Sequence, residues 1–216
     1  AEKSARKSSL SRDIELNLGT LLGIFLGLGA IAGRDKLTFL TDSTLSPLGA
    51  WLEQLVAESS GKEGKGIVPV ADEPLVEAEK YSDDRLFVYL RFQGEQDEFV
   101  EGLKAAGQNV IILDVPERYD LAAEFFLWEF AVAVACSLIG VNAFDQPDVQ
   151  DNKNRTKQKI TNYMENERLP EPEVLWEGKD AQVFGSAFDG LTACENTSEV
   201  INAFIELAKE GDYIAI

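Results

Sequence analysis

Four short apolar runs, each containing β-branched or aromatic residues, recur along the first half of this chain. Segments with helical periodicity lie between them, and strands that alternate with helices build βα units around a parallel sheet. The predicted strands are residues 37–41, 67–70, 85–91 and 109–115, and the helices between and after them are 47–57, 96–106 and 121–139. We therefore expect an α/β fold, a mainly parallel sheet with helices on both faces.

An apolar segment with regularly spaced glycines precedes the first strand. Residues 18–33 are fewer than the ~20 that a membrane-spanning helix needs. Gly19, Gly23 and Gly27 recur every four residues, which would let a helix pack closely on a neighbour. We expect a buried core helix over about 13–32 that ends at Gly33, a suitable cap. Residues 1–12 are polar and without periodicity, and are expected to be a disordered arm or linker.

The second half of the chain is less regular. Pro147 is predicted to start a polar helix that runs to about residue 165. Residues 169–172 are a predicted linker, the pattern leaves 173–194 open, and a helix over 198–209 and a strand at 213–216 follow. We expect one domain over 13–216. Because chains seldom stop on an interior strand, we also expect this to be a piece of a longer chain.

The charge balance narrows the choice of partners. The chain holds 20 basic and 38 acidic residues, a formal net charge of −18. This argues against nucleic acid and anionic membranes, which need basic patches, but a small phosphorylated ligand needs only one or two cations. The chain has no histidine, so acid–base chemistry must rely on carboxylates, lysines or residues from outside. Cys136 and Cys194 lack metal-site spacing, and we expect no disulfide, no metal, no cofactor and a cytoplasmic location.

A junction between two predicted helices places polar side chains together. Asn142 is expected to stop the apolar helix, and Pro147 to start the next one. Gln146 and Lys153 are then about two turns apart and lie near one helical face. They are either part of a site or an ordinary exposed helix start.

In doubly wound sheets, ligands gather at the carboxyl ends of the strands. The loop of residues 41–46 is predicted to lie there. Its hydroxyls precede a helix, so they either bind an anion or cap and brace the turn; they belong to Ser43, Thr44 and Ser46. We expect the 58–66 region to lie at the same edge.

Glu58 stands at the end of its predicted helix. The helix dipole disfavours a carboxylate there and should raise its pKa, as a general base near neutral pH requires. Lys62 and Lys65 would oppose that shift, and a solvated glutamate is the simpler alternative.

The predicted long helices also carry side chains that call for burial or a partner. Glu129 lies among apolar residues and is expected to make a structural hydrogen bond. Trp51 and Trp128 are expected to belong to the core.

Several of these stretches resemble glucose-6-phosphate isomerase. The resemblance is carried, in order along the chain, by Arg34–Thr38, by Glu53–Lys62 with its Glu-Ser-Ser-Gly-Lys element, by Phe126–Phe130 and by Phe144–Val149. It runs from about residue 13 to the end and is strongest to the form fused behind transaldolase. It implies the sugar isomerase (SIS) fold, a flavodoxin-like, Rossmann-like three-layer sandwich used twice per subunit. The chain is similar to the second copy.

By motif position, the resemblance implies roles for individual residues. Glu58 would be the base that moves a proton between C1 and C2 of the sugar through a cis-enediol. Gln146 would help to hold the substrate near its phosphate, and Lys153 would assist ring opening and charge stabilisation. Further substrate contacts are expected at Ser59, Gly61 and Lys62.

Three parts of that family's site have no counterpart here: the serine/threonine phosphate cradle, an arginine and a ring-opening histidine. The resemblance implies that the first SIS copy and a homodimer partner supply them, with transaldolase as a further part of the same chain. The chain alone is then expected to be inactive. Two alternatives stay open. One is a non-catalytic phosphosugar-binding SIS module that senses its ligand through Ser43, Thr44 and Ser46, and the other is a structural dimerisation domain.

Overall fold

The computed structural model describes residues 17–169, 172–209 and 212. Contacts within the chain divide it into two units, residues 1–150 and 151–216, which we treat separately. The expectation of one domain over 13–216 stays a prediction. The expected arm over 1–12 and the expected strand over 213–216 lie outside the described residues.

The first unit is built on a four-stranded sheet. Its strands are β1 (Lys36–Thr41), β2 (Val68–Val70), β3 (Arg85–Arg91) and β4 (Asn109–Asp114), in the order β2-β1-β3-β4. All three pairings are parallel, and the order is that of the first four strands of a flavodoxin-like sheet. The predicted α/β class is therefore confirmed.

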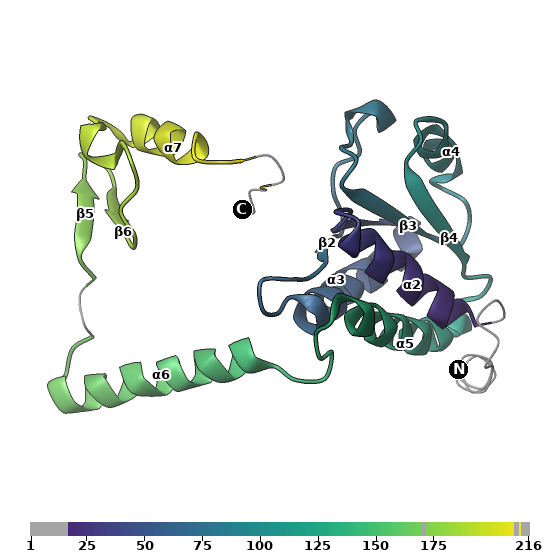
Figure 1. Ribbon diagram of the computed structural model, residues 1–216, viewed down its shortest axis with the longest axis horizontal. Helices are drawn as coiled ribbons and strands as arrows, with labels where there is room; N and C mark the ends of the chain where they lie inside the picture. Colours follow the sequence, from purple (N-terminus) through teal and green to yellow (C-terminus); the bar gives the residue numbers. More distant parts are fainter. Residues whose placement is uncertain (1–16, 170–171, 210–211, 213–216) are drawn as a thin grey trace. The chain divides into compact units, whose positions relative to one another are not determined.

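Helices cover both faces of this sheet (Figure 1). Alternation along β3 sends Leu86, Val88 and Leu90 to one face, and Phe87 and Tyr89 to the other. The first face packs on α2 (Leu18–Ile31), α3 (Ser46–Ser60) and α5 (Leu121–Ile139), and the second packs on α4 (Asp97–Ala105). Short 3-10 turns are η2 (Ser43–Leu45), η3 (Ala78–Lys80), η4 (Arg118–Asp120) and η5 (Leu191–Ala193).

The glycines of α2 allow it to lie directly against α5. A Cβ atom on Gly23 would stand 2.5 Å from the carbonyl oxygen of Ala131, and one on Gly27 would stand 2.9 Å from Leu138. The predicted close helix contact is confirmed. The helix ends as expected at Gly33, which has a φ of 81° and donates to Ala30, while Arg34 N–H reaches Gly29.

α5 is a core helix, although by length and composition it could cross a membrane. Its inward face holds Leu127, Trp128 and Ala131, all buried against the first face of the sheet. The Trp128 ring meets Phe39 edge-on at 5.4 Å, which confirms its expected place in the core. Trp51 is only partly buried and packs edge-on against Phe125.

The second unit is smaller. α6 (Pro147–Asn166) starts at Pro147 as predicted and leads into it. An antiparallel pair, β5 (Val174–Glu177) and β6 (Gln182–Phe184), fills much of the region that the sequence pattern left open. α7 (Thr197–Ile205) follows, with Asn196 accepting a hydrogen bond from Glu199 N–H as its N-cap.

Candidate functional site

Lys62 ties together the two segments that the sequence motifs single out. Its side chain is 4% exposed, and its Nζ donates to the carbonyl oxygens of Asn142 and Asp145. Nζ also lies 3.1 Å from Oδ1 of Asp145. These contacts use the three donors of the ammonium. The end of α3 and the turn of residues 142–145 before α6 are therefore held as one surface of the first unit.

The backbone around Lys62 is shaped to deliver this side chain. Lys62 and Lys65 exchange two backbone hydrogen bonds of 3.0 and 2.9 Å across a tight turn. Glu63 and Gly64, at the centre of the turn, both have positive φ, as a type I′ turn requires. Lys65 Nζ donates to the Ile139 carbonyl at 3.3 Å, so the turn contacts the end of α5 as well.

The glycine and serines of the motif have structural partners. A Cβ atom on Gly66 would stand 2.9 Å from the Cα atom of Gly61, so these two backbones touch. Ser60 is fully buried; its hydroxyl donates to Val56 O at 2.7 Å and accepts from Ile67 N–H at 2.9 Å. The Cys136 thiol donates to Ser59 O at 3.4 Å, and burial raises the pKa of that thiol despite the opposing charge of Lys62.

The turn of residues 142–145 is preorganised on its own side. α5 ends at Ile139, as its predicted range has it, and the residue that caps it is Gly140, with a φ of 80°, and not Asn142. Asn142 instead braces the turn: its Oδ1 accepts from Phe144 N–H, and its Nδ2 donates to Asp145 Oδ2, each at 3.1 Å.

One expectation about position is wrong. We expected the 58–66 region at the carboxyl ends of the strands, but α3 runs back along the sheet and this region immediately precedes β2. β2 starts beside the first residue of β1, since Val68 pairs with Lys36. The Lys62 contacts therefore lie at the amino edge of the sheet, opposite the 41–46 loop.

The residues expected to act on a substrate fall at two places in the chain. Glu58 is exposed in the last turn of α3, where its Oε1 accepts from Gln54 Nε2 at 3.1 Å. Gln146 is exposed just beyond Asp145, and its carbonyl accepts from Gln150 N–H at the start of α6. Both belong to the first unit, next to the Lys62 contacts. Lys153 is exposed on α6 and belongs to the second unit.

At the alternative anion site, the donors of Ser43 and Ser46 already make hydrogen bonds to carboxylates of the chain. Ser43 donates from its N–H and its Oγ to the carboxylate of Glu95, at 2.8 and 2.9 Å. Ser46 is the first residue of α3 and gives its hydroxyl to Asp72 at 3.1 Å, with no capping bond. Thr44 is exposed.

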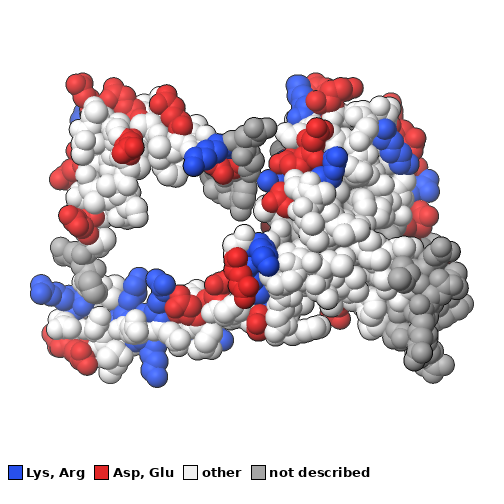
Figure 2. All heavy atoms as spheres, viewed as in Figure 1, with Lys and Arg blue, Asp and Glu red and all other residues white. Residues whose placement is uncertain are grey.

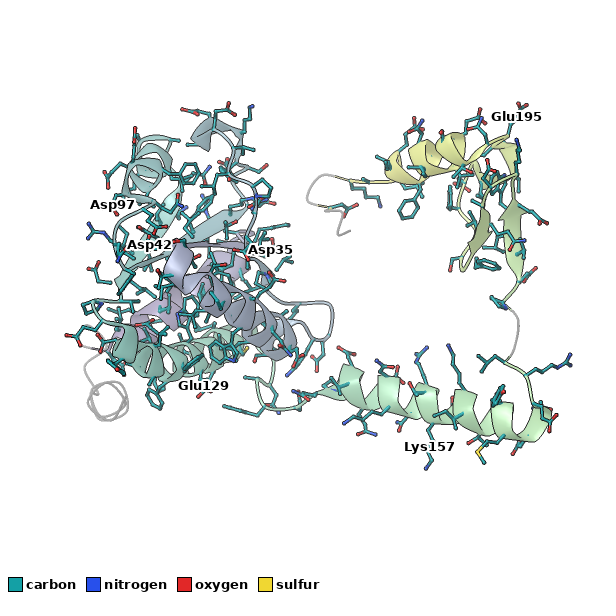
Figure 3. All side chains as sticks on the ribbon, turned by 180° about the vertical axis from the view of Figure 1, so that it is seen from behind. Asp35, Asp42, Asp97, Glu129, Lys157 and Glu195 are labelled. Carbon is teal, nitrogen blue, oxygen red and sulfur yellow. The ribbon has the colours of Figure 1, made fainter. Side chains whose placement is uncertain are left out.

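The carboxylate that α5 buries is not the expected one. Glu129 is exposed, so its position demands no structural hydrogen bond (Figure 3). Glu124, one turn earlier, is 8% exposed, and its Oε2 has no hydrogen-bond partner. Burial, with a smaller effect of Asp120, raises the pKa of Glu124 to about 7. Its position one helical turn before Trp128, on the core face, was the available signal for this burial.

Within the described residues, no three histidine, cysteine or carboxylate side chains converge in a way that could hold a metal ion. The two segments that Lys62 joins instead carry carboxylates (Glu58, Asp145) and amides (Asn142, Gln146). That set can accept and return a proton and can bind hydroxyl groups.

These features define an α/β domain with a four-stranded, all-parallel sheet flanked by helices, consistent with an SIS or Rossmann-like sandwich. A crystal structure of a hypothetical protein from Thermus thermophilus has the same fold, with a TM-score of 0.58 and 22% identity over 73% of this chain and 49% of that one. Among curated proteins, the chain is distantly similar to the glucose-6-phosphate isomerase of Heliobacterium modesticaldum. The two are 31% identical over 52% of this chain and 34% of the relative, so the match spans about a third of that protein. No family model matches the chain.

Proposed function

We propose that this chain is part of a phosphosugar isomerase that interconverts glucose 6-phosphate and fructose 6-phosphate without metal or cofactor. The observation that carries the proposal is the Lys62 contact set, which fixes the Glu58 and Gln146 segments next to each other in the first unit. The distant similarity to a glucose-6-phosphate isomerase supports the same reaction class.

In this proposal, Glu58 is the base. Its carboxylate takes the proton from C2 of the open-chain aldose, which leaves a cis-enediolate with negative charge on O1. A proton then moves from the C2 hydroxyl to O1, and Glu58 returns its proton to C1 to give the ketose. Exposure of Glu58 leaves its second oxygen accessible to a substrate, while the bond from Gln54 orients the first.

Lys62 acts as a positioning residue in this proposal. Its three donors are used within the chain, so it acts on the reaction through the 142–145 turn and thereby through Gln146. Gly61 and Ser59 serve the same surface through their backbones. In this proposal, that structural role takes the place of the direct substrate contacts expected at Ser59, Gly61 and Lys62.

α6 supports the binding of an anionic substrate. Four cations stand at alternate positions along it within an acidic chain, and Figure 2 shows blue side chains over this helix: Lys153, Arg155, Lys157 and Lys159. Arg155 is paired with Asp151 at 2.6 Å, so the support comes from the three lysines. Lys153 is proposed to stabilise negative charge during ring opening and proton transfer. The remaining groups would come from a first SIS copy, with a homodimer partner and a fused transaldolase as further proposals.

The test is Glu58→Gln in the full-length protein. Loss of the base should lower turnover by about 10²–10⁴-fold in both directions, with sugar phosphate binding retained. It should also abolish exchange of the C2 hydrogen of glucose 6-phosphate with solvent, followed by proton NMR in deuterated water.

A matched control is Glu63→Gln, which neutralises another exposed glutamate five positions further on. It should leave turnover and exchange unchanged. Near-normal turnover of Glu58→Gln, or an equal loss in both variants, would remove Glu58 as the base.

A further inference from the structure

The loops that follow β1 and β3 meet at the carboxyl edge of the sheet. These strands are neighbours in the order β2-β1-β3-β4, and the connections from them lead in opposite directions across the sheet. In doubly wound folds this switch point is the crevice where ligands bind. It lies at the edge opposite the Lys62 contacts.

Asp42, the first residue after β1, places its carboxylate at this switch point. The residue is 0% exposed. Its Oδ2 accepts from three successive backbone N–H groups of the loop after β3: Phe92 at 3.0 Å, Gln93, and Gly94 at 2.8 Å. Its Oδ1 accepts from Glu95 N–H at 3.2 Å. Figure 3 labels Asp42 near the start of α4.

Tyr89, which lies on β3, supplies one further donor. Its hydroxyl donates to Oδ1 of Asp42 and accepts from Gln96 N–H at 3.1 Å. Five donors therefore converge on one carboxylate, which offers about four lone-pair positions. The carboxylate has no acceptor capacity left over.

The loop after β3 has the form of an anion-binding loop. Successive N–H groups point at one centre, Gly94 takes a φ of 84°, and α4 starts directly behind it. Such concave arrangements of N–H groups hold phosphate in many α/β proteins. Here the negative charge at the centre comes from within the chain.

A second carboxylate makes the exchange reciprocal. Glu95 belongs to the loop after β3 and accepts from both Ser43 N–H and Ser43 Oγ in the loop after β1. Each loop thus donates to a carboxylate of the other. The hydroxyl and backbone N–H donors at this edge are therefore bonded to carboxylates of the chain itself.

We propose that the loop of residues 92–95 is a phosphate-type anion site whose occupant is the carboxylate of Asp42, so that the chain closes its own switch-point crevice to external phosphate. An entering phosphate would need the same N–H groups and would meet a buried negative charge. This inference stands apart from the proposed isomerase function, because it concerns the opposite edge of the sheet.

Asp42 stays charged under ordinary conditions. Burial alone would raise the pKa of Asp42, but the hydrogen bonds from Tyr89 and from the 92–94 backbone outweigh it, and the pKa is lowered. Burial and the bond to Asp42 raise the pKa of Tyr89 well above its ordinary value, so the hydroxyl remains a donor.

The test uses inorganic phosphate as the probe and the backbone amides of Gln93, Gly94 and Glu95 as reporters in nitrogen-15 NMR spectra of the full chain. In the unchanged chain, phosphate should not shift these amides. In Asp42→Ala, which removes the occupant and leaves the donors, phosphate should shift them saturably, with at least about tenfold tighter binding than in the unchanged chain. Asp42→Asn, which keeps the volume and adds an N–H donor, should bind phosphate more weakly than Asp42→Ala.

The proposal would be overturned by saturable phosphate shifts at these amides in the unchanged chain, or by a folded Asp42→Ala variant without a phosphate response. If Asp42→Ala does not fold in phosphate-free buffer, refolding that depends on phosphate supports the proposal. The proposal is contradicted if Asp42→Ala does not refold even at high phosphate and the folded Asp42→Asn variant shows no phosphate shifts at these amides.

Discussion

The Nζ atom of Lys62 lies 3.1 Å from Oδ1 of Asp145, and this partly buried contact joins the end of α3 to the turn before α6. Because the same ammonium also donates to two carbonyl oxygens of that turn, one side chain fixes the separation of two segments 80 residues or more apart in the chain. The position of Gln146 relative to Glu58 depends on it.

Lys62→Met should destabilise the first unit. The substitution keeps an unbranched side chain that is one atom shorter and uncharged, and it leaves the Asn142 and Asp145 carbonyls without their donor, at a cost of about 2–3 kcal/mol. Urea unfolding followed by tryptophan fluorescence would measure this cost. Lys65→Met is the control, because Lys65 is exposed and makes a single 3.3 Å bond; it should change stability by less than about 1 kcal/mol. Equal effects of the two would argue against the bridging role of Lys62.

Gly23→Ala should separate α2 from α5. The added methyl would stand 2.5 Å from the Ala131 carbonyl oxygen and 2.6 Å from the Cβ atom of Val134, so the helices must shift, at about 1–3 kcal/mol. Thermal unfolding would detect the loss.

Gly102→Ala in α4 provides the matched comparison. A Cβ atom at Gly102 meets nothing within 4 Å, and alanine is the better helix former. This variant should therefore be about 0.4–1 kcal/mol more stable than the unchanged chain. A gain in stability for Gly23→Ala would contradict the close packing of the two helices.

The helices and strands of the first unit could be predicted well, because the pattern of buried and exposed residues within each element is visible in its own sequence. The range of β3 matches its prediction, Arg85–Arg91, and α5 matches at Leu121–Ile139. Close packing of α2 on a neighbour could also be predicted, since glycines at four-residue spacing leave room on one helical face, but the sequence did not identify α5 as that neighbour. The edge on which Glu58 falls was predicted wrongly although the order of the elements indicates it. In a parallel sheet, the segment that leads into the next strand lies at the amino edge, and residues 58–66 lead into β2.

Glu124 should make stability depend on pH. In the folded chain its pKa is raised from 4.5 to about 7, so the folded state keeps a proton that the unfolded state releases above pH 4.5. Its contribution to stability therefore falls as the pH rises from about 4.5 to 7 and is constant above that. Glu124→Gln lacks this loss.

The expected result for Glu124→Gln is a gain over the unchanged chain at pH 8 that is absent at pH 4, of at most about 3 kcal/mol. Denaturant titrations of both proteins across this range would measure the difference. A difference that does not change with pH would show that the pKa of Glu124 is the same in the folded and unfolded states.

The two cysteines, both free thiols, should differ in reactivity. Cys136 is 1% exposed and its pKa is raised by burial, whereas Cys194 is partly exposed. Maleimide at pH 8 should label Cys194 faster by on the order of tenfold or more. Mass spectrometry of timed samples would follow both sites. Comparable rates would mean that α5 opens readily from the sheet.

The candidate site could be predicted only in part, for a physical reason. Motif residues such as Glu58 and Gln146 are visible in the sequence, but Asp42 gains its importance from four N–H groups 50 or more positions away. Lys62 was likewise expected to contact the substrate, because the sequence around it does not show that two distant main-chain carbonyls accept its hydrogen bonds. Hydrogen bonds to main-chain groups far away in the sequence cannot be predicted from residue types, because every residue carries such groups.

That last property has a consequence for how such a chain can change over generations. Two of the three contacts of Lys62 end on carbonyl oxygens, which every amino acid possesses, so residues of the turn can be exchanged without losing these two acceptors. Only the lysine itself has no substitute of equal reach and charge. We expect related chains to keep a lysine at this point while the turn that it holds diverges more freely in composition, so that selection acts mainly on one end of the contact.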